Sequence, residues 1–184
     1  IAFTSINHMG FVLLGIFTLN LYGVSGAMFQ MFNHAAAVGF LFMLSGYIHE
    51  QAKTREIPLL KGLKNSMPRT SVLLVLASMA AMGVPIFSPF LSEYMVIVGA
   101  ISVDVRLAIA MLIPVIVVGY FLYMIKRVVM SPLDKTGLKY HDMSRFSLIY
   151  LILFLIPLVL LLIFPSLILN LTNPVAESLI QLGG

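Results

Sequence analysis

Long apolar stretches separated by short polar segments dominate the sequence. The apolar stretches are residues 1–21, 24–49, 70–101, 105–130 and 146–169, and the two main polar loops are 50–69 and 131–145. A helix needs about 20 apolar residues to cross the hydrocarbon core of a bilayer. The pattern therefore predicts an all-α fold, a polytopic transmembrane helix bundle of about six spans, with a polar tail at the end.

The stretch 70–101 is too long to be one straight spanning helix. As a continuous helix it would be about 48 Å long, against a hydrocarbon core of about 30 Å. Gly83, Pro85 and Pro89 interrupt it, and proline removes a backbone donor and disfavours helix at the residue before it. We expect a discontinuous helix near residues 83–101, with the loss of regular helix between 83 and 92.

The basic residues bear on how often this stretch crosses the membrane. Five of the eleven Lys and Arg lie in 50–69, five lie in 126–145, and Arg106 lies between them. One crossing puts both basic loops on the same face and satisfies the positive-inside rule. Two crossings put them on opposite faces, where the rule does not favour either orientation. Composition favours one crossing, and length permits either.

Composition excludes several other classes of protein. The chain is 60% hydrophobic and 10% charged, with a mean hydropathy of +1.05, which is far from a soluble domain. It has no Cys, so thiolate metal sites and disulfides are excluded, and its four His are scattered. The net charge of +4 arises in the loops and reflects topology, not nucleic-acid binding.

Glu93 is the most unusual residue in an apolar stretch. It has no Lys or Arg within ten residues on either side. A carboxylate in hydrocarbon costs about 2.5–3.5 kcal/mol on insertion scales, so such residues usually face a protein interior, water or a proton path. The alternative is a position at the membrane surface, because Glu93 follows a proline-rich turn.

Two histidines lie within apolar stretches. His34 is near the middle of 24–49, one helical turn after Gln30, and it can carry a proton or act as a packing device. His8 lies close to Thr4, Ser5 and Asn7. That grouping fits either a hydrated internal face or an interfacial position.

Lys126 follows "GYFLYMI" within the stretch 105–130 and is beside Arg127. Basic residues at the end of a span usually extend to the headgroups and anchor the helix. Only an inward-pointing Lys126 could exchange a proton with the interior.

Three motifs carry a resemblance to a known family. In order and spacing, "TSINHMGF", "NHAAAVGFLF" and "GVPIFSPFLSEY" resemble the second half of the antiporter-like subunits of respiratory complex I. These proton-pumping subunits are related to the D subunit of multisubunit cation/proton antiporters and to membrane-bound hydrogenase subunits. The resemblance covers residues 1–184 as the second inverted repeat plus C-terminal spans, with the upstream part absent.

The resemblance assigns roles to individual residues. An acidic residue at the position of Glu93 indicates the M, or subunit 4, type or the similar D type. His34 matches an intramembrane histidine of a proton-transfer axis, and His8 matches a second one nearby. Ala35 departs from the glycine common in the family. The resemblance also implies that 70–101 crosses the membrane twice, which would put loop 131–145 on the side of a peripheral electron-transfer arm and loop 50–69 on the opposite side.

The function implied is a proton-translocating subunit of a complex I-like oxidoreductase in an energy-transducing membrane, namely a prokaryotic cell, mitochondrial inner or thylakoid membrane. Glu93, His34, His8 and Lys126 are the candidate proton-translocation residues. No cofactor is expected in this chain; quinone and the redox cofactors belong to partner subunits. The expected partners are other membrane subunits, including further antiporter-like ones, and lipid. The alternatives are a D-type antiporter subunit and a non-conducting structural subunit.

Overall fold

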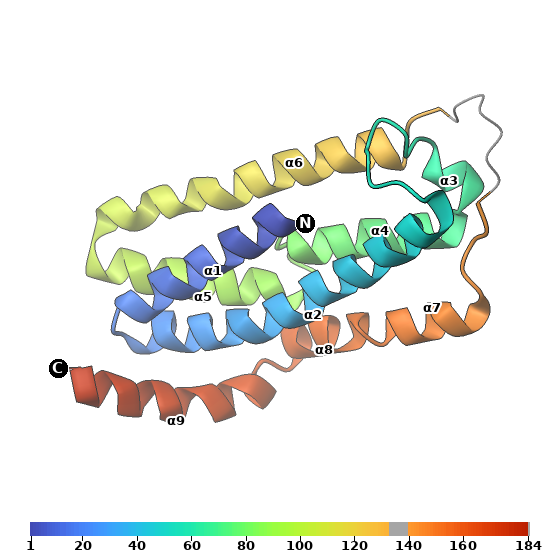
Figure 1. Cartoon of the computed structure of the whole chain (residues 1–184). Coiled ribbons are helices and arrows are strands. Elements are labelled where there is room, and N and C mark those ends of the chain that lie inside the picture. Colours follow the sequence, from blue (N-terminus) through green and yellow to red (C-terminus); the bar gives the residue numbers. More distant parts are fainter. Residues whose placement is uncertain (133–139, 184) are drawn as a thin grey trace.

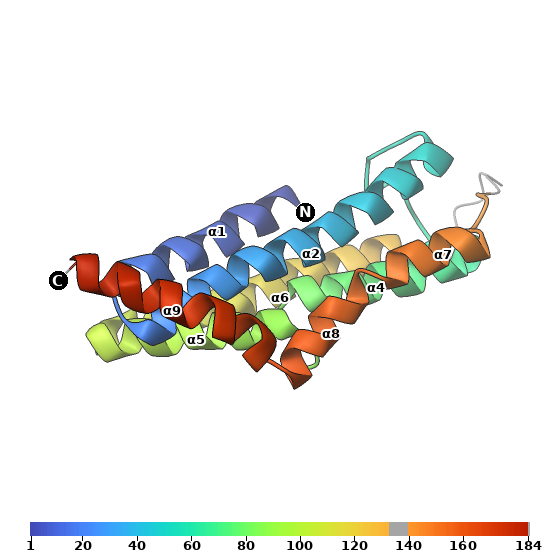
Figure 2. The same ribbon diagram turned by 90° about the horizontal axis from the view of Figure 1, so that it is seen from below.

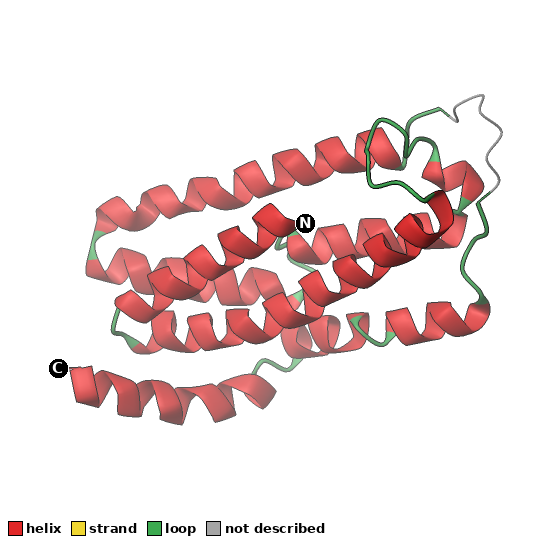
Figure 3. Cartoon of the chain, in the orientation of Figure 1, coloured by secondary structure: helices red, strands yellow, loops and turns green. Residues whose placement is uncertain are grey.

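The computed structural model describes residues 1–132 and 140–183, and all regular structure in these ranges is helical. In chain order the elements are α1 (Ala2–Phe17), α2 (Leu21–Ala52), α3 (Leu63–Ser66), α4 (Pro68–Ala81), α5 (Ser88–Val103), the 3₁₀ helix η1 (Val105–Met111), α6 (Leu112–Val128), α7 (Arg145–Ile152), α8 (Leu155–Ile163) and α9 (Ser166–Gly183). The longer helices run roughly along one common axis (Figures 1 and 3). The predicted all-α membrane bundle is confirmed.

Helix length and apolar composition identify the membrane segments. Residues Leu21–Ala52, Val105–Val128 and Phe146–Ile163 are long and apolar enough to cross a bilayer, and α1, α4 and α5 are shorter apolar helices. Large apolar side chains point outward from the bundle, among them Ile109 and Phe146, which are 70% and 77% exposed. Such a surface suits lipid or apolar neighbours in a membrane, not water.

The predicted break in the third apolar stretch is confirmed at residues 82–87, between α4 and α5. Val84 N donates to Met79 O and Gly83 N donates to Ala80 O, which is the hydrogen-bond pattern of a Schellman helix ending. Gly83 has φ +68°, a left-handed conformation that glycine adopts without steric cost. Pro89 lies in the first turn of α5, where its missing N–H costs nothing.

The two crossings implied by the resemblance are wrong, because α4 and α5 lie end to end and together make one passage (Figures 1 and 2). Helices of 14 and 16 residues are about 21 and 24 Å long, too short to cross the core separately. Both pack against α2, which runs antiparallel to them. Asn20, the N-cap of α2, donates to Gly99 O near the end of α5, and Asn33 donates to Ser92 near its start.

The two basic loops consequently lie at the same end of the bundle, so the prediction that they face opposite sides is also wrong. Asp142 accepts hydrogen bonds from Arg69 N (2.9 Å), Thr70 N (3.1 Å) and Thr70 Oγ1 (2.8 Å) at the start of α4. Partial burial acts to raise the pKa of Asp142, but these donors and Met143 N lower it below its usual value. The contact joins one loop to the other; residues 133–139 of loop 131–145 lie outside the described residues.

In the C-terminal part the expected span from Phe146 is present but interrupted, and the expected polar tail is instead a helix. Residues 146–163 form α7 and α8 with an interruption at Leu153–Phe154, and the expected tail is the helix α9. Helix α9 lies beside the first half of α2, where Ser25 Oγ donates to Asn173 Oδ1 at 2.8 Å. Thr172 and Ala176 are buried on its inner face. The tail is polar enough to be read as a loop from the sequence, but it forms a helix that packs on the bundle.

Candidate functional site

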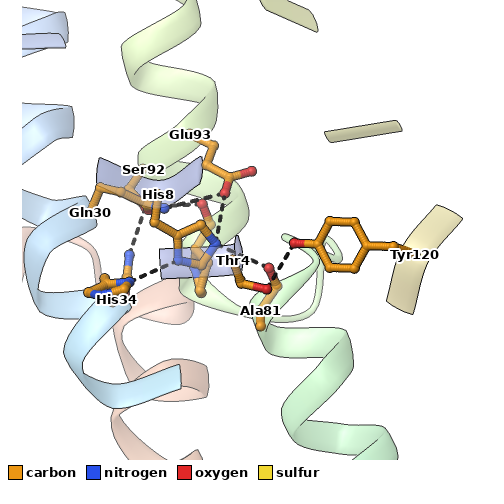
Figure 4. A network of polar contacts seen from close by, with 10 residues as sticks. Thr4, His8, Gln30, His34, Ala81, Ser92, Glu93 and Tyr120 are labelled. Atoms are coloured by element: carbon orange, nitrogen blue, oxygen red, sulfur yellow. Dashed lines mark hydrogen bonds and ion pairs between the residues drawn. The ribbon is translucent and has the colours of Figure 1, made fainter. Parts of the chain in front are cut away.

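The break between α4 and α5 creates a polar site inside the bundle. Helix α4 ends at Ala81, so the Ala81 carbonyl has no helical partner and instead accepts from His8 Nε2 at 3.2 Å. Helix α5 begins at Ser88 and presents Glu93 in its second turn. Side chains from α1 and α2 point toward the same place, as Figure 4 shows.

Glu93 is buried within the bundle, with 6% of its surface exposed, so it is not a surface residue of this fold. Gln30 Nε2 donates to its Oε1 at 3.3 Å, and His8 Nε2 lies 3.7 Å from the same oxygen. A Cβ atom added to Gly83 would lie 2.7 Å from Glu93 Oε2. Gln30 and His8 therefore contact one oxygen of the carboxylate, and the other oxygen occupies the space that a side chain at position 83 would need.

His8 and His34 form a direct pair. Their Nδ1 atoms are 3.2 Å apart, and their rings meet edge to face with centroids 5.4 Å apart. His8 is fully buried, which removes the interfacial alternative, and His34 is half-buried. The Ala81 carbonyl can only accept a hydrogen bond, so His8 carries its proton on Nε2 when neutral. His34 Nδ1 must then donate to His8 Nδ1.

The structure thus brings together three of the four predicted residues: His34 contacts His8, and His8 contacts Glu93. Lys126 is not among them. It is exposed near the C-terminal end of α6, beside Arg127, whose guanidinium lies 5.1 Å from the centre of the Tyr123 ring. This position suits the anchoring role that is usual for basic residues at the end of a span.

Several polar residues of the site carried no predicted role. Ser88 and Ser92 are one helical turn apart on α5 and fully buried, and their matched spacing was the available signal. Tyr120 of α6 is half-buried, and its hydroxyl lies 2.8 Å from Thr4 Oγ1, one turn before His8. In the part of the chain that the structure describes, no three or more His, Asp or Glu are arranged to hold a metal ion.

These features define a class: a helical membrane protein with an interrupted helix that holds a buried carboxylate beside two histidines. The family described as "NADH:quinone oxidoreductase/Mrp antiporter, TM" matches residues 1–119. The chain belongs to this family.

Relatives extend the match to the rest of the chain. NADH-quinone oxidoreductase subunit M of Rhodobacter capsulatus is 38% identical over 98% of this chain and 36% of its own length. NADH-ubiquinone oxidoreductase chain 4 of Marchantia polymorpha is 29% identical over 100% of this chain and 37% of its own length. The chain thus spans a little over a third of these relatives. The resemblance to subunit M and chain 4 is confirmed.

Solved structures show the same fold. A chain of respiratory complex I from Thermus thermophilus with bound NADH superposes with a TM-score of 0.87 and 27% identity, covering 96% of this chain and 38% of that one. A chain of an archaeal membrane-bound sulfane sulfur reductase gives a TM-score of 0.72 at 20% identity, covering 97% of this chain and 43% of that one. The second similarity concerns the fold alone.

Proposed function

We propose that this chain is the C-terminal part of a proton-translocating membrane subunit of a complex I-like oxidoreductase, with Glu93, His8 and His34 as its proton-transfer groups. The observation that carries the proposal is the continuous contact His34–His8–Glu93 beside the helix break. Ionisable groups inside a membrane protein are costly, and they usually mark ion or proton pathways.

The hydrogen-bond directions define one order of transfer. A proton that binds His34 at Nε2 releases the proton on its Nδ1 to His8 Nδ1, across 3.2 Å. His8 then gives its Nε2 proton to Glu93 Oε1, across 3.7 Å, by turning away from the Ala81 carbonyl. One proton enters at His34, one arrives on Glu93, and both histidines end neutral in the opposite tautomer. Because rotation of a histidine ring does not interchange Nδ1 and Nε2, the starting tautomers return only by proton exchange at these nitrogens.

The partners and the redox chemistry belong to the same proposal. We assign quinone reduction and all redox cofactors to partner subunits, and we expect further antiporter-like subunits beside this one in an energy-transducing membrane. The matched relatives are named as subunits of NADH-quinone and NADH-ubiquinone oxidoreductases. The family description also includes Mrp antiporters, so a D-type subunit of a cation/proton antiporter is the second candidate.

Mass spectrometry of the purified complex separates the two candidates. Subunits with a quinone site or iron–sulfur clusters support the oxidoreductase. Companion subunits of an antiporter without electron carriers would replace it with the second candidate.

The residue-level test uses Glu93→Gln in the full-length subunit within the assembled complex. Gln retains the shape of Glu but cannot ionise. We expect quinone reduction and proton translocation in vesicles to fall at least about tenfold, because proton transfer by a positioned side chain typically contributes more than that. Glu93→Asp should retain partial activity.

Glu177→Gln is the matched control, since Glu177 is an exposed glutamate on α9 and should be replaceable without loss. Normal rate and stoichiometry of proton translocation in Glu93→Gln would overturn the proposed role of this residue.

A further inference from the structure

Four uncharged side chains form a row of hydrogen bonds that ends at Glu93. Ser88 Oγ donates to Asn33 Oδ1 (2.6 Å), and Asn33 Nδ2 donates to Ser92 Oγ (2.8 Å). Ser92 Oγ donates to Gln30 Oε1 and also lies 3.0 Å from Pro89 O in its own helix. Gln30 Nε2 donates to Glu93 Oε1 (3.3 Å). Each of the four residues has no exposed surface. The row alternates between α5 and α2 across their interface.

All donors in this row point the same way. Asn33, Ser92 and Gln30 each accept one hydrogen bond from the preceding member and donate one to the next. The carboxylate at the end is the one charged group of the row, and hydrogen bonds to an ionised acceptor are stronger than those between neutral groups. Aligned bonds in a low-dielectric interior also polarise one another, so the row acts as a unit.

The row is unsuited to carrying protons itself. The amides of Asn33 and Gln30 have no group that gains or loses a proton in the physiological range, so a proton cannot pass through them. What the row does fix is orientation. Gln30 holds the Glu93 oxygen that lies 3.7 Å from His8, while the other oxygen is packed against Gly83.

We propose that Ser88, Asn33, Ser92 and Gln30 are positioning residues that hold Oε1 of Glu93 in line with His8 Nε2 and stabilise its charged form. This inference rests on the proposed proton-transfer function. It adds that the side of Glu93 that faces Gln30 is closed by groups that do not titrate, so proton exchange at Oε1 runs through His8.

Ser92→Ala in the full-length subunit of the assembled complex tests the proposal, because it removes a single oxygen from the middle of the row. We expect coupled quinone reduction and proton translocation to fall about tenfold, the usual effect of losing one hydrogen bond in a charged network. The pH profile of the coupled rate should also be displaced from that of the unmodified complex. Ser92→Thr, which retains a hydroxyl, should restore most of the rate.

Ser78→Ala is the matched control. Ser78 is equally buried, but its hydroxyl donates to Leu74 O within its own helix, so the rate and pH profile should remain unchanged. Ser88→Ala cuts the row at its far end and should cause a smaller loss with a pH profile displaced in the same sense. This variant keeps the test decisive if Ser92→Ala fails to assemble.

The proposal is overturned if Ser92→Ala and Ser88→Ala both match Ser78→Ala in rate and pH profile. Glu93→Gln, measured in parallel, separates this failure from failure of the proposed function. A strong loss in Glu93→Gln with normal serine variants rejects the positioning row alone. A normal Glu93→Gln rejects the proton-transfer site and the row with it.

Discussion

Two membrane passages contain an interrupted helix, α4–α5 and α7–α8, and the side chains around the two interruptions differ. Between α4 and α5, six residues leave the helix, the Ala81 carbonyl is released, and His8, Gln30 and Glu93 gather there. Between α7 and α8 only Leu153 and Phe154 leave it, and the ring of Phe154 stacks on Phe40 with centroids 6.3 Å apart.

The sequence explains both interruptions. Pro157 cannot donate to the carbonyl of residue 153 and its ring crowds that carbonyl, so the α7–α8 chain bends at Leu153. The α4–α5 break has in addition the left-handed Gly83, which turns the chain fully out of the helix. A helix break in a membrane protein thus provides free backbone groups, but it becomes a chemical site only where neighbouring helices supply polar side chains.

The largest effect among the tests of this comparison is expected from Gly83→Ala. The new Cβ would lie 2.7 Å from Glu93 Oε2, at a φ of +68° that costs a non-glycine residue about 1–3 kcal/mol. We expect proton translocation to be nearly abolished, with a reduced yield of assembled complex. Gly119→Ala on α6 is the control, since a Cβ there meets nothing within 4 Å. Equal activity in the two variants would show that the break does not constrain Glu93.

A smaller effect is expected from His34→Ala. It removes the outer member of the histidine pair and should reduce proton translocation at least about tenfold, as for other proton-transfer groups. The loss of assembled complex should be small, because His34 is only half-buried. Lys126→Ala should leave the rate near normal, since Lys126 is exposed at the end of α6. For both variants, the rate of proton translocation is measured and divided by the amount of assembled complex. An equal loss of assembled complex in both variants would mean that His34 serves packing and not proton transfer.

Of the two interruptions, the one at α7–α8 should be the less sensitive, and Pro157→Ala tests it. Replacing this proline lets α7 and α8 join and should change proton translocation by less than about twofold, while stability stays the same or rises slightly. Thermal unfolding and the coupled rate of the complex measure both quantities. A loss as large as that of Gly83→Ala would contradict the distinction between the two breaks.

Part of this architecture could be predicted from the sequence. The helix break was predicted from Gly83, Pro85 and Pro89. Glu93 was predicted to be functional because no Lys or Arg lies near it in the sequence. The charge count also favoured a single crossing, and the resemblance to a family led away from it. Hydrophobicity gives the length of a stretch but not the direction in which the chain leaves a break, so the end-to-end arrangement of α4 and α5 required the structure.

The partners of Glu93 were harder to predict, for physical reasons. Ser88 and Ser92 are small residues common in membrane helices, and nothing in their own sequence positions shows that they meet Asn33 across an interface. His8 had two interpretations because its depth depends on where α1 lies relative to α2. Helix α9 was missed because its polar residues lower the average hydropathy of a segment that is nevertheless helical.

The most direct test of the central claim is infrared difference spectroscopy of the complex during turnover, with and without Glu93→Gln. The account predicts a carboxyl C=O band that appears or shifts when Glu93 gains a proton, that is absent in Glu93→Gln, and that is retained in Glu177→Gln. An identical difference spectrum in the complex with and without Glu93→Gln, at an unchanged rate of proton translocation, would contradict it.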